Sequence, residues 1–593
     1  METTITSTQG KDIVDRWSKM CTTKMPYQRM WQLIGEYVYI RKLDYISTLA
    51  PGQFNTEAVF DTTAVDAHKR TSASLMGHIF PASSDNFDLV APDDIDPMIA
   101  ALPDVKQFYS NITRITHKHM RHKDAGLARV TGEFYHDLVG PGTAGIGTFK
   151  SDVVTTALSY SMFDVRECCI DENARGQIDT TFQTKKWTVR QVIQEYGYDG
   201  VSQEIRDKWN AKNYDEKIEV IIAIEPRIMR SKTGSHGAHE FPYKSVHVEK
   251  SSLAELRNSG FHENPIAWGR LWKNSGEIYG RSPSTDLMPT VIVANALEEL
   301  SLLGTEKAVD PPLVMQDDGS FGGGTVDTSA RALIVRKISG KIQPGEKGIE
   351  PLHLVDLGDL KTVEDKLARI RDTIKIGYML DLLQSLGKES RITAYEADLL
   401  NTLRGMMLCL IFANQYDEVW TPTIDRSVSI LLEGKYYGLP EQATEYHENR
   451  RELGLIPLVI PEPIWNLMMA GEEWYKINYK TPAARILRSE ELAALERFKG
   501  MAIEGGQAIP EIMDNLDVDV MIRTMQQLTG AGADVVRDTK TVASIRKARA
   551  EAQQMNQGLV QGEAKAEIAK KATQAAHSAT KAGLDPVQVL GSI

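Results

Sequence analysis

Two glycine-rich stretches are the closest approaches in this sequence to a nucleotide-binding motif. Gly140, Gly142 and Gly145 have the GxGxxG spacing of a dinucleotide site, which requires a helix that begins at the glycines so that its amides meet a pyrophosphate. The residues that follow, IGTFKSDVVTTAL, predict a strand instead. Gly340–Gly348 has the glycine spacing of a phosphate-binding loop, but Glu346 stands where that loop needs lysine. We interpret both stretches as turns, and a nucleotide-dependent enzyme is the least supported hypothesis.

Other catalytic patterns are missing from the sequence. There is no HExxH, no GxSxG and no paired cluster of metal ligands. Pairs of ionisable residues stand alone at His239–Glu240, His262–Glu263 and Asp517–Asp519. The cysteines form no CxxC pair and are expected to be small buried residues: Cys21, Cys168, Cys169 and Cys409. These observations argue against nucleophilic or metal-assisted chemistry, so we expect no enzyme activity, no cofactor and no metal.

Basic residues in the middle of the chain are the remaining candidates for ligand contacts. Lys366, Arg369 and Lys375 alternate with acidic residues along an expected helix, as on a solvated face with salt bridges. In a closed ring, each would instead repeat around a lumen and form a band that touches a passing DNA backbone weakly. Lys388 and Arg391, in the polar loop SLGKESRI, are open to the same two interpretations.

Composition describes a large soluble protein of several units. The chain has 593 residues, 42% of them hydrophobic and 25% charged, which suggests three to five structural units. No apolar run approaches the roughly eighteen residues of a membrane span, and the N-terminus lacks the pattern of a signal peptide. A net charge of −12 argues against a protein that binds nucleic acid by itself. It is compatible with a tube through which DNA slides, because strong phosphate contacts would slow transit.

The first half is expected to mix helices and strands. Helical spacing predicts helices at 26–47, 61–79 and 187–196, the last beginning at Thr188. β-branched and aromatic runs predict strands at 85–91, 143–170 and 217–228.

Two long helices form the middle of the chain. Ser282 as N-cap and Pro283 at the first helical position predict a helix that ends near residue 308, with Pro289 bending it or delaying its regular start. Its expected apolar face is Val293, Leu297, Leu300 and Leu303. A capping-box pattern at Thr362 and Asp365 predicts the second helix, which ends near Ser385. Its expected apolar face is Leu367, Ile370, Ile374, Tyr378 and Leu382.

In the remaining segments, proline, glycine and capping residues indicate where helices and strands begin and end. A small β-rich excursion with a strand at 332–338 separates the two helices, and a third helix runs from Thr393 to about Gly434 with a break at Pro422. Short strands and turns are expected at 440–480. Helices are expected at 487–539, with short breaks at Gly505–Gly506 and at the TGAGAD stretch. Residues 541–581 predict a helix whose apolar stripe is too thin to bury alone, so it needs a neighbour, such as a copy of itself. The alternative is a frayed or disordered tail.

Five stretches together resemble the portal, or head-to-tail connector, proteins of short-tailed bacteriophages (podovirus type). They are PYQRMWQLIGEYVYIRKLDY, FDTTAVDAHKRTSASLMGHIFPASSDNFDL, RLWKNSGEIYGRSPSTDLMPTVIVANALEE, TAYEADLLNTLRGMM and LDVDVMIRTMQQLTGAGADVVRDTKTVASIRKARAEAQQ. The third is the most distinctive, and the resemblance covers about two-thirds of the chain in register.

The resemblance implies an α+β, predominantly helical portal fold that assembles as a ring. Its parts would be a wing (1–281), stem helix one (282–308), a clip (309–358), stem helix two (359–385), a tunnel loop (386–393), a long helix with the rest of the wing (394–485), a crown (486–540) and a C-terminal barrel helix (541–593).

The resemblance also implies function and partners. The chain would form a dodecamer at the unique capsid vertex, a channel through which double-stranded DNA is packaged and ejected. Terminase large subunit and then tail adaptor or head completion proteins would dock on the clip, for which we name Gly322, Gly323, Gly324, Lys341 and Lys347. Major capsid and scaffolding proteins are further expected partners, and a membrane is not. The expected location is the portal vertex of the virion, after assembly in the host cytoplasm. The alternative hypothesis is a scaffold or capsid-associated protein that does not conduct DNA.

Overall fold

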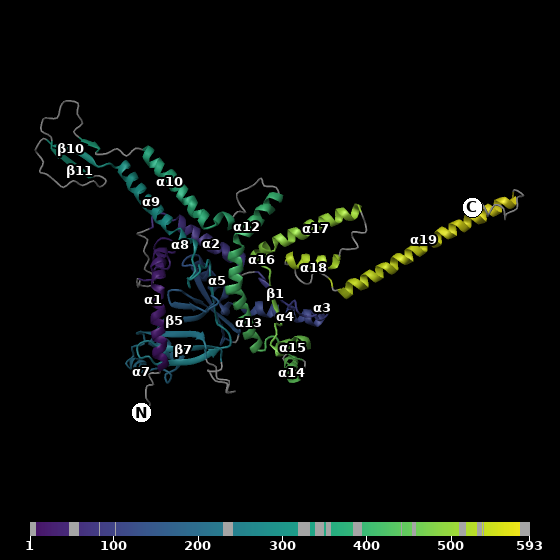
Figure 1. Cartoon of the computed structure of the whole chain (residues 1–593), viewed down its shortest axis with the longest axis horizontal. Helices are drawn as coiled ribbons and strands as arrows, with labels where there is room; N and C mark the ends of the chain where they lie inside the picture. The colour runs from purple at the N-terminus through teal and green to yellow at the C-terminus, as the bar shows by residue number, and fades with distance from the viewer. Residues whose placement is uncertain are drawn as a thin grey trace, which may run out of the picture. The chain divides into compact units, whose positions relative to one another are not determined.

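The structure is a computed structural model, and the following description concerns the residues that it places. They are 8–46, 59–81, 84–100, 102–153, 155–228, 241–317, 332–337, 349–351, 357–383, 394–440, 442–452, 458–508, 517–529, 537 and 539–581. The chain separates into two compact units, Met1–Glu490 and Glu491–Ile593. Helices dominate and several small sheets accompany them (Figure 1), so the predicted α+β, predominantly helical class is confirmed.

A five-stranded antiparallel sheet carries helices on both faces. Its order is β4 (Cys168–Glu172), β5 (Ile178–Thr188), β6 (Lys217–Pro226), β7 (Tyr243–Glu249) and β8 (Glu255–Phe261). Ile221 of β6 packs in a cluster with Ile13 of α1 (Thr8–Tyr37), whereas Val220 packs with α6 (Val189–Tyr196) and α7 (Gln203–Asn210). Neighbouring residues of a strand point to opposite faces, so the continuous apolar run of β6 reflects burial on both sides.

Helix α1 begins well before the predicted residue 26. Pro26 lies inside the helix rather than at its start, and Ile13, Trp17 and Cys21 precede it at helical spacing against the sheet. Burial of that apolar side outweighs the hydrogen bond that a proline removes. The short helix α6 is as predicted, because Thr188 caps it and forms a capping box with Gln191.

A three-stranded antiparallel sheet follows the GxGxxG stretch. Its order is β3 (Leu158–Phe163), β2 (Thr143–Lys150) and β9 (Ile266–Arg270). Gly142 has a φ of +90°, and Gly145 lies against the ring of Trp268, where an added Cβ would be only 3.0 Å away. The glycines therefore permit a turn and a close strand crossing, and the predicted strand is confirmed.

The long central helix is interrupted where proline predicted a break. It comprises α12 (Ala394–Gln415), a π-helical segment (Tyr416–Trp420) and α13 (Thr421–Glu433). Pro422 lies in the first turn of α13, where its missing N–H is tolerated. The predicted N-cap Thr393 lies outside the described residues.

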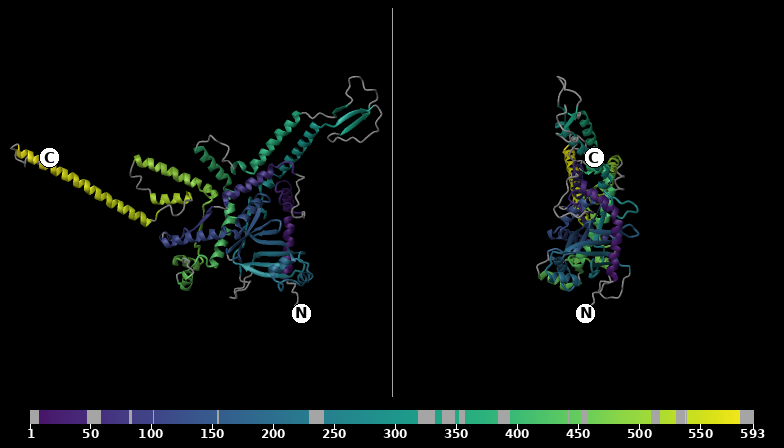
Figure 2. Two further views of the ribbon diagram at one scale, coloured as in Figure 1. Left: turned by 180° about the vertical axis from the view of Figure 1, so that it is seen from behind. Right: turned by 90° about the vertical axis from the view of Figure 1, so that its left-hand side faces the viewer.

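Two helices lie side by side and lead to a small sheet (Figures 1 and 2). They are α9 (Met288–Val309), which follows the short α8 (Pro283–Asp286), and α10 (Leu357–Gly377), which precedes α11 (Leu380–Leu383). The sheet has the order β11 (Leu333–Lys337), β10 (Leu313–Asp317) and β12 (Ile349–Pro351). It confirms the predicted β-rich excursion.

The starts of these helices test the capping predictions. Ser282 caps α8 and forms a capping box with Thr285, and Pro289 stands in the first turn of α9, after a break at Leu287. Both predictions are confirmed. The predicted start at Thr362 is wrong, because α10 begins at Leu357. A T-x-x-D pattern also suits a solvated helix surface, and Thr362 and Asp365 are exposed there.

Shorter elements complete the first unit. They are α2 (Thr63–Ile79), β1 (Phe87–Val90), α3 (Pro97–Ala100), α4 (Pro103–Met120), a 3₁₀ turn (Lys123–Ala125), α5 (Leu127–Val139), β13 (Leu439–Pro440), α14 (Thr444–Glu452), β14 (Val459–Ile460), α15 (Glu462–Ala470), β15 (Lys476–Tyr479) and α16 (Pro482–Leu487). The predicted strands and turns at 440–480 are thus only partly correct. Pro463 stands in the first turn of the helix α15, a position that proline favours.

The second unit is helical among the residues described. It contains α18 (Val518–Thr529) and the 43-residue α19 (Thr539–Lys581), and α17 (Ser489–Ala508) leads into it. The predicted break at Gly505–Gly506 is wrong, because α17 continues through both glycines. A single pair of glycines weakens a helix without ending it.

Buried Arg270 holds the π-helical segment against both sheets. Its side chain is 3% exposed and pairs with Glu418 at 2.6 Å and with Glu172 at 3.0 Å. It also donates to the carbonyl of Gly176 at 2.9 Å. One guanidinium thus joins the long central helix, β9 and the β4–β5 turn.

Replacement of Arg270 by Met should destabilise the fold by about 3–5 kcal/mol, because the two carboxylates then lose their buried partner. Urea unfolding followed by tryptophan fluorescence measures the change. The matched control is Lys476→Met, since the pair of Lys476 with Asp93 is exposed and should contribute only about 0–1 kcal/mol. Equal losses in the two variants would contradict this ranking.

Two cysteines from distant parts of the chain meet under α1. The Sγ atoms of Cys21 and Cys169 lie 3.1 Å apart, although 148 positions separate the residues. Cys168 and Cys169 are buried, as expected, whereas Cys21 and Cys409 are half-buried. The contact between Cys21 and Cys169 records the packing of α1 on the edge strand β4.

Oxidised glutathione should therefore join Cys21 to Cys169, taking up the two electrons and leaving as two molecules of thiol. Mass spectrometry of a non-reducing digest should find the linked peptides, and the link should raise stability by roughly 2–4 kcal/mol. Cys168→Ser should leave the link intact and Cys169→Ser should abolish it. A link from Cys21 to Cys168 would show that β4 lies in another register.

Candidate stem and docking surfaces

Helix α9 carries apolar side chains on two opposite sides. One side packs on the rest of the unit through Met288, Val291 and Ala294. At about 100° per residue, the predicted apolar residues Val293, Leu300 and Leu303 lie on the other side, where they are 47%, 62% and 46% exposed. Leu297 is the member of the predicted face that packs partly against the core. The predicted face therefore exists, but it points mainly away from the chain's own core.

The predicted apolar face of the second helix, in contrast, packs on the core, so it is not the exposed contact face that a ring would need. Leu367, Ile374 and Tyr378 are buried, while Ile370 and Leu382 pack partly against the core. A Cβ on Gly377 would come within 2.6 Å of the Leu287 side chain. The base of the helix pair is therefore tightly packed.

A polar network fixes this base to the start of α2. Arg371 of α10 donates to Asp61 at 2.8 Å and to Glu298 of α9 at 2.9 Å. Asn295 of α9 accepts hydrogen bonds from the backbone amides of Phe60 and Asp61, both at 2.9 Å. Burial favours the neutral acid, but hydrogen bonds from Thr63 and Arg371 outweigh it and lower the pKa of Asp61. The ionised carboxylate thus anchors both α9 and α10.

The basic candidates on α10 do not form one patch. Lys366, Arg369 and Lys375 are all exposed. Lys366 and Arg369 lie one turn apart on the same side, whereas Lys375 lies on another side and pairs with Asp372 at 3.2 Å. The structure thus brings two of the three together.

The other candidates from the sequence fall outside the described residues. These are the tunnel-loop residues Lys388 and Arg391 and the clip residues Gly322, Gly323, Gly324, Lys341 and Lys347. Their assignments remain predictions.

A buried ionic cluster is the arrangement that most resembles a catalytic site. Lys42 donates to Asp137 at 2.7 Å and to Asp164 at 2.8 Å, and Arg166 also pairs with Asp164. Burial opposes ionisation, yet the two cations lower the pKa of Asp164, and the two carboxylates raise the pKa of Lys42. Because these charges are engaged with one another, the cluster joins the turn after α1, α5 and the β3–β4 loop rather than offering a free acid or base.

The described residues hold neither a candidate metal cluster nor a candidate membrane span. Where side chains are placed, His, Cys, Asp and Glu nowhere gather in a group of three that could hold a metal ion. Among the described helices, none is both long and apolar enough to span a membrane.

Helix α9 thus presents apolar surface that the rest of the described chain leaves uncovered. Comparison with known proteins gives the family. A family model described as bacteriophage head to tail connecting protein matches residues 10–536. The chain therefore belongs to the family of bacteriophage head to tail connecting proteins.

Two relatives span nearly the whole chain. A portal protein of Salmonella phage epsilon15 is 24% identical over 578 residues, which cover 95% of each chain. A probable portal protein of Bordetella phage BPP-1 is 22% identical over 562 residues, which cover 93% of each. The prediction of a portal, or head-to-tail connector, protein is thus confirmed, and the family is structural.

Solved structures give a weaker likeness. A chain from the neck of a native GTA particle, computed with C12 symmetry, is 11% identical and has a TM-score of 0.32. The alignment covers 73% of this chain and 87% of that chain. A chain from the virion of a native gene transfer agent particle is 12% identical, with a TM-score of 0.27 and coverage of 68% and 92%.

Sequence reasoning missed the residues that position the stem. Asp61 and Arg371 are 310 positions apart, and neither belongs to a local motif. The signal that could have found them is weak: Asp61 stands two residues before α2, in a position to accept from the Thr63 amide.

Proposed function

We propose that copies of this chain close into a ring that forms the portal of a phage head and conducts DNA. The observation that carries the proposal is the apolar outer side of α9. A helix with apolar residues on two opposite sides is normally buried on both, and this one is covered on one side only. A neighbouring copy in a ring supplies the missing cover.

Ring closure by rotation requires two different surfaces on each copy, one for each neighbour. The outer side of α9, with Ile292, Val293, Leu300 and Leu303 exposed, is one such surface. Ile376 of α10 and Met406, Met407 and Leu410 of α12 are also exposed and are candidates for the second surface. The dodecamer and the partition into wing, stem, clip, tunnel loop, crown and barrel are part of this proposal.

Charge supports a channel through which DNA moves without being held. Each copy adds a net charge of −12, so the assembled ring is strongly negative and repels the DNA backbone. A few basic positions, Lys388 and Arg391 in the tunnel loop and Lys366 and Arg369 on α10, then touch the backbone weakly and repeatedly.

Partners follow from the family and from relatives that are named portal proteins. Terminase large subunit docks on the clip during packaging, and tail adaptor or head completion proteins replace it. Major capsid and scaffolding proteins surround the ring at one vertex, after assembly in the host cytoplasm.

The double variant Leu300→Asp, Leu303→Asp tests the ring. Buried carboxylates without partners are strongly unfavourable, so rings should disappear while circular dichroism shows the same helix content. Electron microscopy and light scattering count the copies in each particle. Thr305→Asp, at an exposed polar position of the same helix, is the matched control and should leave rings intact. Rings that survive the double variant would place the subunit contact elsewhere.

Replacement of both Lys388 and Arg391 by Ala tests the channel. Rings should remain intact, while the amount of packaged DNA, or its retention in filled heads, should change because a phosphate contact is lost from every copy. A second variant, in which Ala replaces both Lys366 and Arg369, shows whether packaging depends more on the tunnel loop or on α10. Unchanged packaging in intact rings of both variants would mean that these residues are only solvated charges, and would favour a scaffold that does not conduct DNA.

A further inference from the structure

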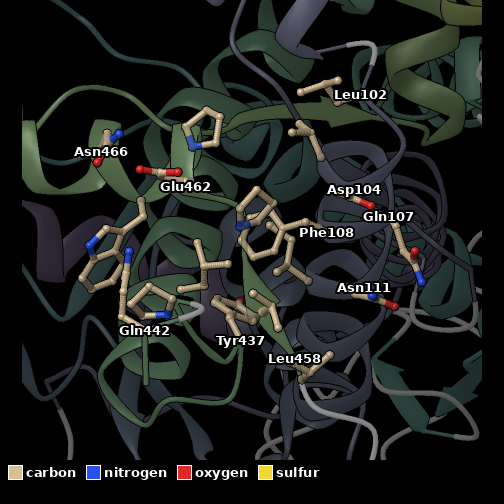
Figure 3. A pocket seen from close by; sticks show the side chains of 18 of the residues that line it. Leu102, Asp104, Gln107, Phe108, Asn111, Tyr437, Gln442, Leu458, Glu462 and Asn466 are labelled. Carbon is tan, nitrogen blue, oxygen red and sulfur yellow. The ribbon is translucent and has the colours of Figure 1, made fainter. Parts of the chain in front are cut away.

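A cleft of about 610 Å³ lies beside α4, on the first unit. Helix α4 forms one wall, and the segments 437–442 and 458–466 form the other. Figure 3 shows Asp104, Gln107 and Asn111 on one side of the opening and Glu462 and Asn466 on the other. The volume falls in the range of sites that bind small molecules or short peptide segments.

The floor of the cleft is apolar and firmly held. Phe108, Ile112 and Ile460 are buried, and the hydroxyl of Tyr437 lies 2.6 Å from Thr116 Oγ1. Phe108 also packs against the ring of Tyr109, with centroids 5.6 Å apart. An apolar anchor can therefore enter a cleft that is already formed, without the free-energy penalty of ordering it.

The rim combines amides with acids. Gln107, Asn111, Gln442 and Asn466 line the cleft with Asp104 and Glu462, and the described part of the lining contains no Lys, Arg or His. An amide side chain both donates and accepts, as a peptide backbone requires. Two carboxylates beside an apolar floor favour a cation next to an apolar group, and they repel phosphates.

Three prolines shape the opening. Pro440, Pro461 and Pro463 line the cleft, and proline has no backbone N–H to donate. The backbone around the short β13–β14 pair therefore offers few N–H groups with which an incoming segment could form a further strand. The side chains of the cleft must recognise the segment instead. Apolar and aromatic walls with proline at the rim suit an extended chain whose own side chains fill the floor.

We propose that the α4 cleft binds an extended segment of another protein, one that carries a branched or proline-containing apolar anchor flanked by lysine or arginine. This site is separate from the ring contact on α9, and it does not depend on conduction of DNA. The positive charge of the segment complements the acidic rim, and its backbone pairs with the rim amides.

Fluorescent synthetic peptides test the proposal with the full-length chain. One peptide carries a central Leu-Pro pair flanked by lysines, and its match replaces the lysines by glutamates. Fluorescence anisotropy should show at least roughly tenfold tighter binding of the lysine peptide, with a dissociation constant that rises with salt. Equal binding of the two peptides would overturn the proposal.

Variants locate the binding. Asp104→Asn and Glu462→Gln remove one charge each at exposed positions and should each weaken the lysine peptide roughly fivefold. Asp94→Asn, an exposed acid outside the cleft, should change nothing. Asn111→Trp fills the cleft and should abolish binding. Binding that survives Asn111→Trp, or that falls equally with Asp94→Asn, would place the peptide elsewhere and refute the site.

A photo-reactive benzophenone side chain at Gln107 identifies the occupant. Irradiation with the lysine peptide should label the peptide, and excess unlabelled peptide should compete. A link between two copies of this chain that the peptide cannot displace would show that a second copy fills the cleft, which contradicts the proposal.

Discussion

The helix pair α9 and α10 depends on one physical constraint. Both sides of α9 are apolar and favour burial, but the chain itself buries only one of them. Two helices packed as a pair can cover only the surfaces that face each other. In α10 most of the apolar residues turn toward the core, with Ile376 as an exposed exception, and the outward surface is otherwise largely charged. In α9 they do not, and leucines remain in solvent along the outer side. Exposed apolar surface of this extent marks a place of contact, so the chain is incomplete by itself.

The helix pair α9 and α10 can serve as a contact surface only if its base is held in one position. Arg371 of α10 connects to Glu298 of α9 and to Asp61, two residues before α2, through one guanidinium, whose planar fork of donors fits two carboxylates at once. Asn295 adds a hydrogen-bonded contact to the same backbone. Ionic groups of this kind contribute modestly to net stability but define one geometry. A closed ring needs one defined angle between neighbouring copies, because a small error in that angle adds up over all the copies and prevents the ring from closing.

Local signals in the sequence predicted local structure well. Ser282 and Thr188 were recognisable caps because a side chain that satisfies a free helical amide is encoded within four residues. Pro422 marked the break in the long helix, although not its π-helical form, which also depends on Glu418 and its contact with Arg270 across 148 positions. Thr362 failed because the same short pattern is compatible with a helix interior.

Contacts between distant residues were beyond reach, and so was the direction of an apolar face. The stripe of Val293, Leu300 and Leu303 was visible in the sequence, but periodicity alone cannot say whether a stripe meets its own core or another chain. The answer lay in Met288, Val291 and Ala294, which turn the opposite side of α9 inward. In the sequence, a helix with two apolar sides therefore resembles an ordinary buried helix. Only the tertiary structure shows that the described chain leaves one of the two sides uncovered.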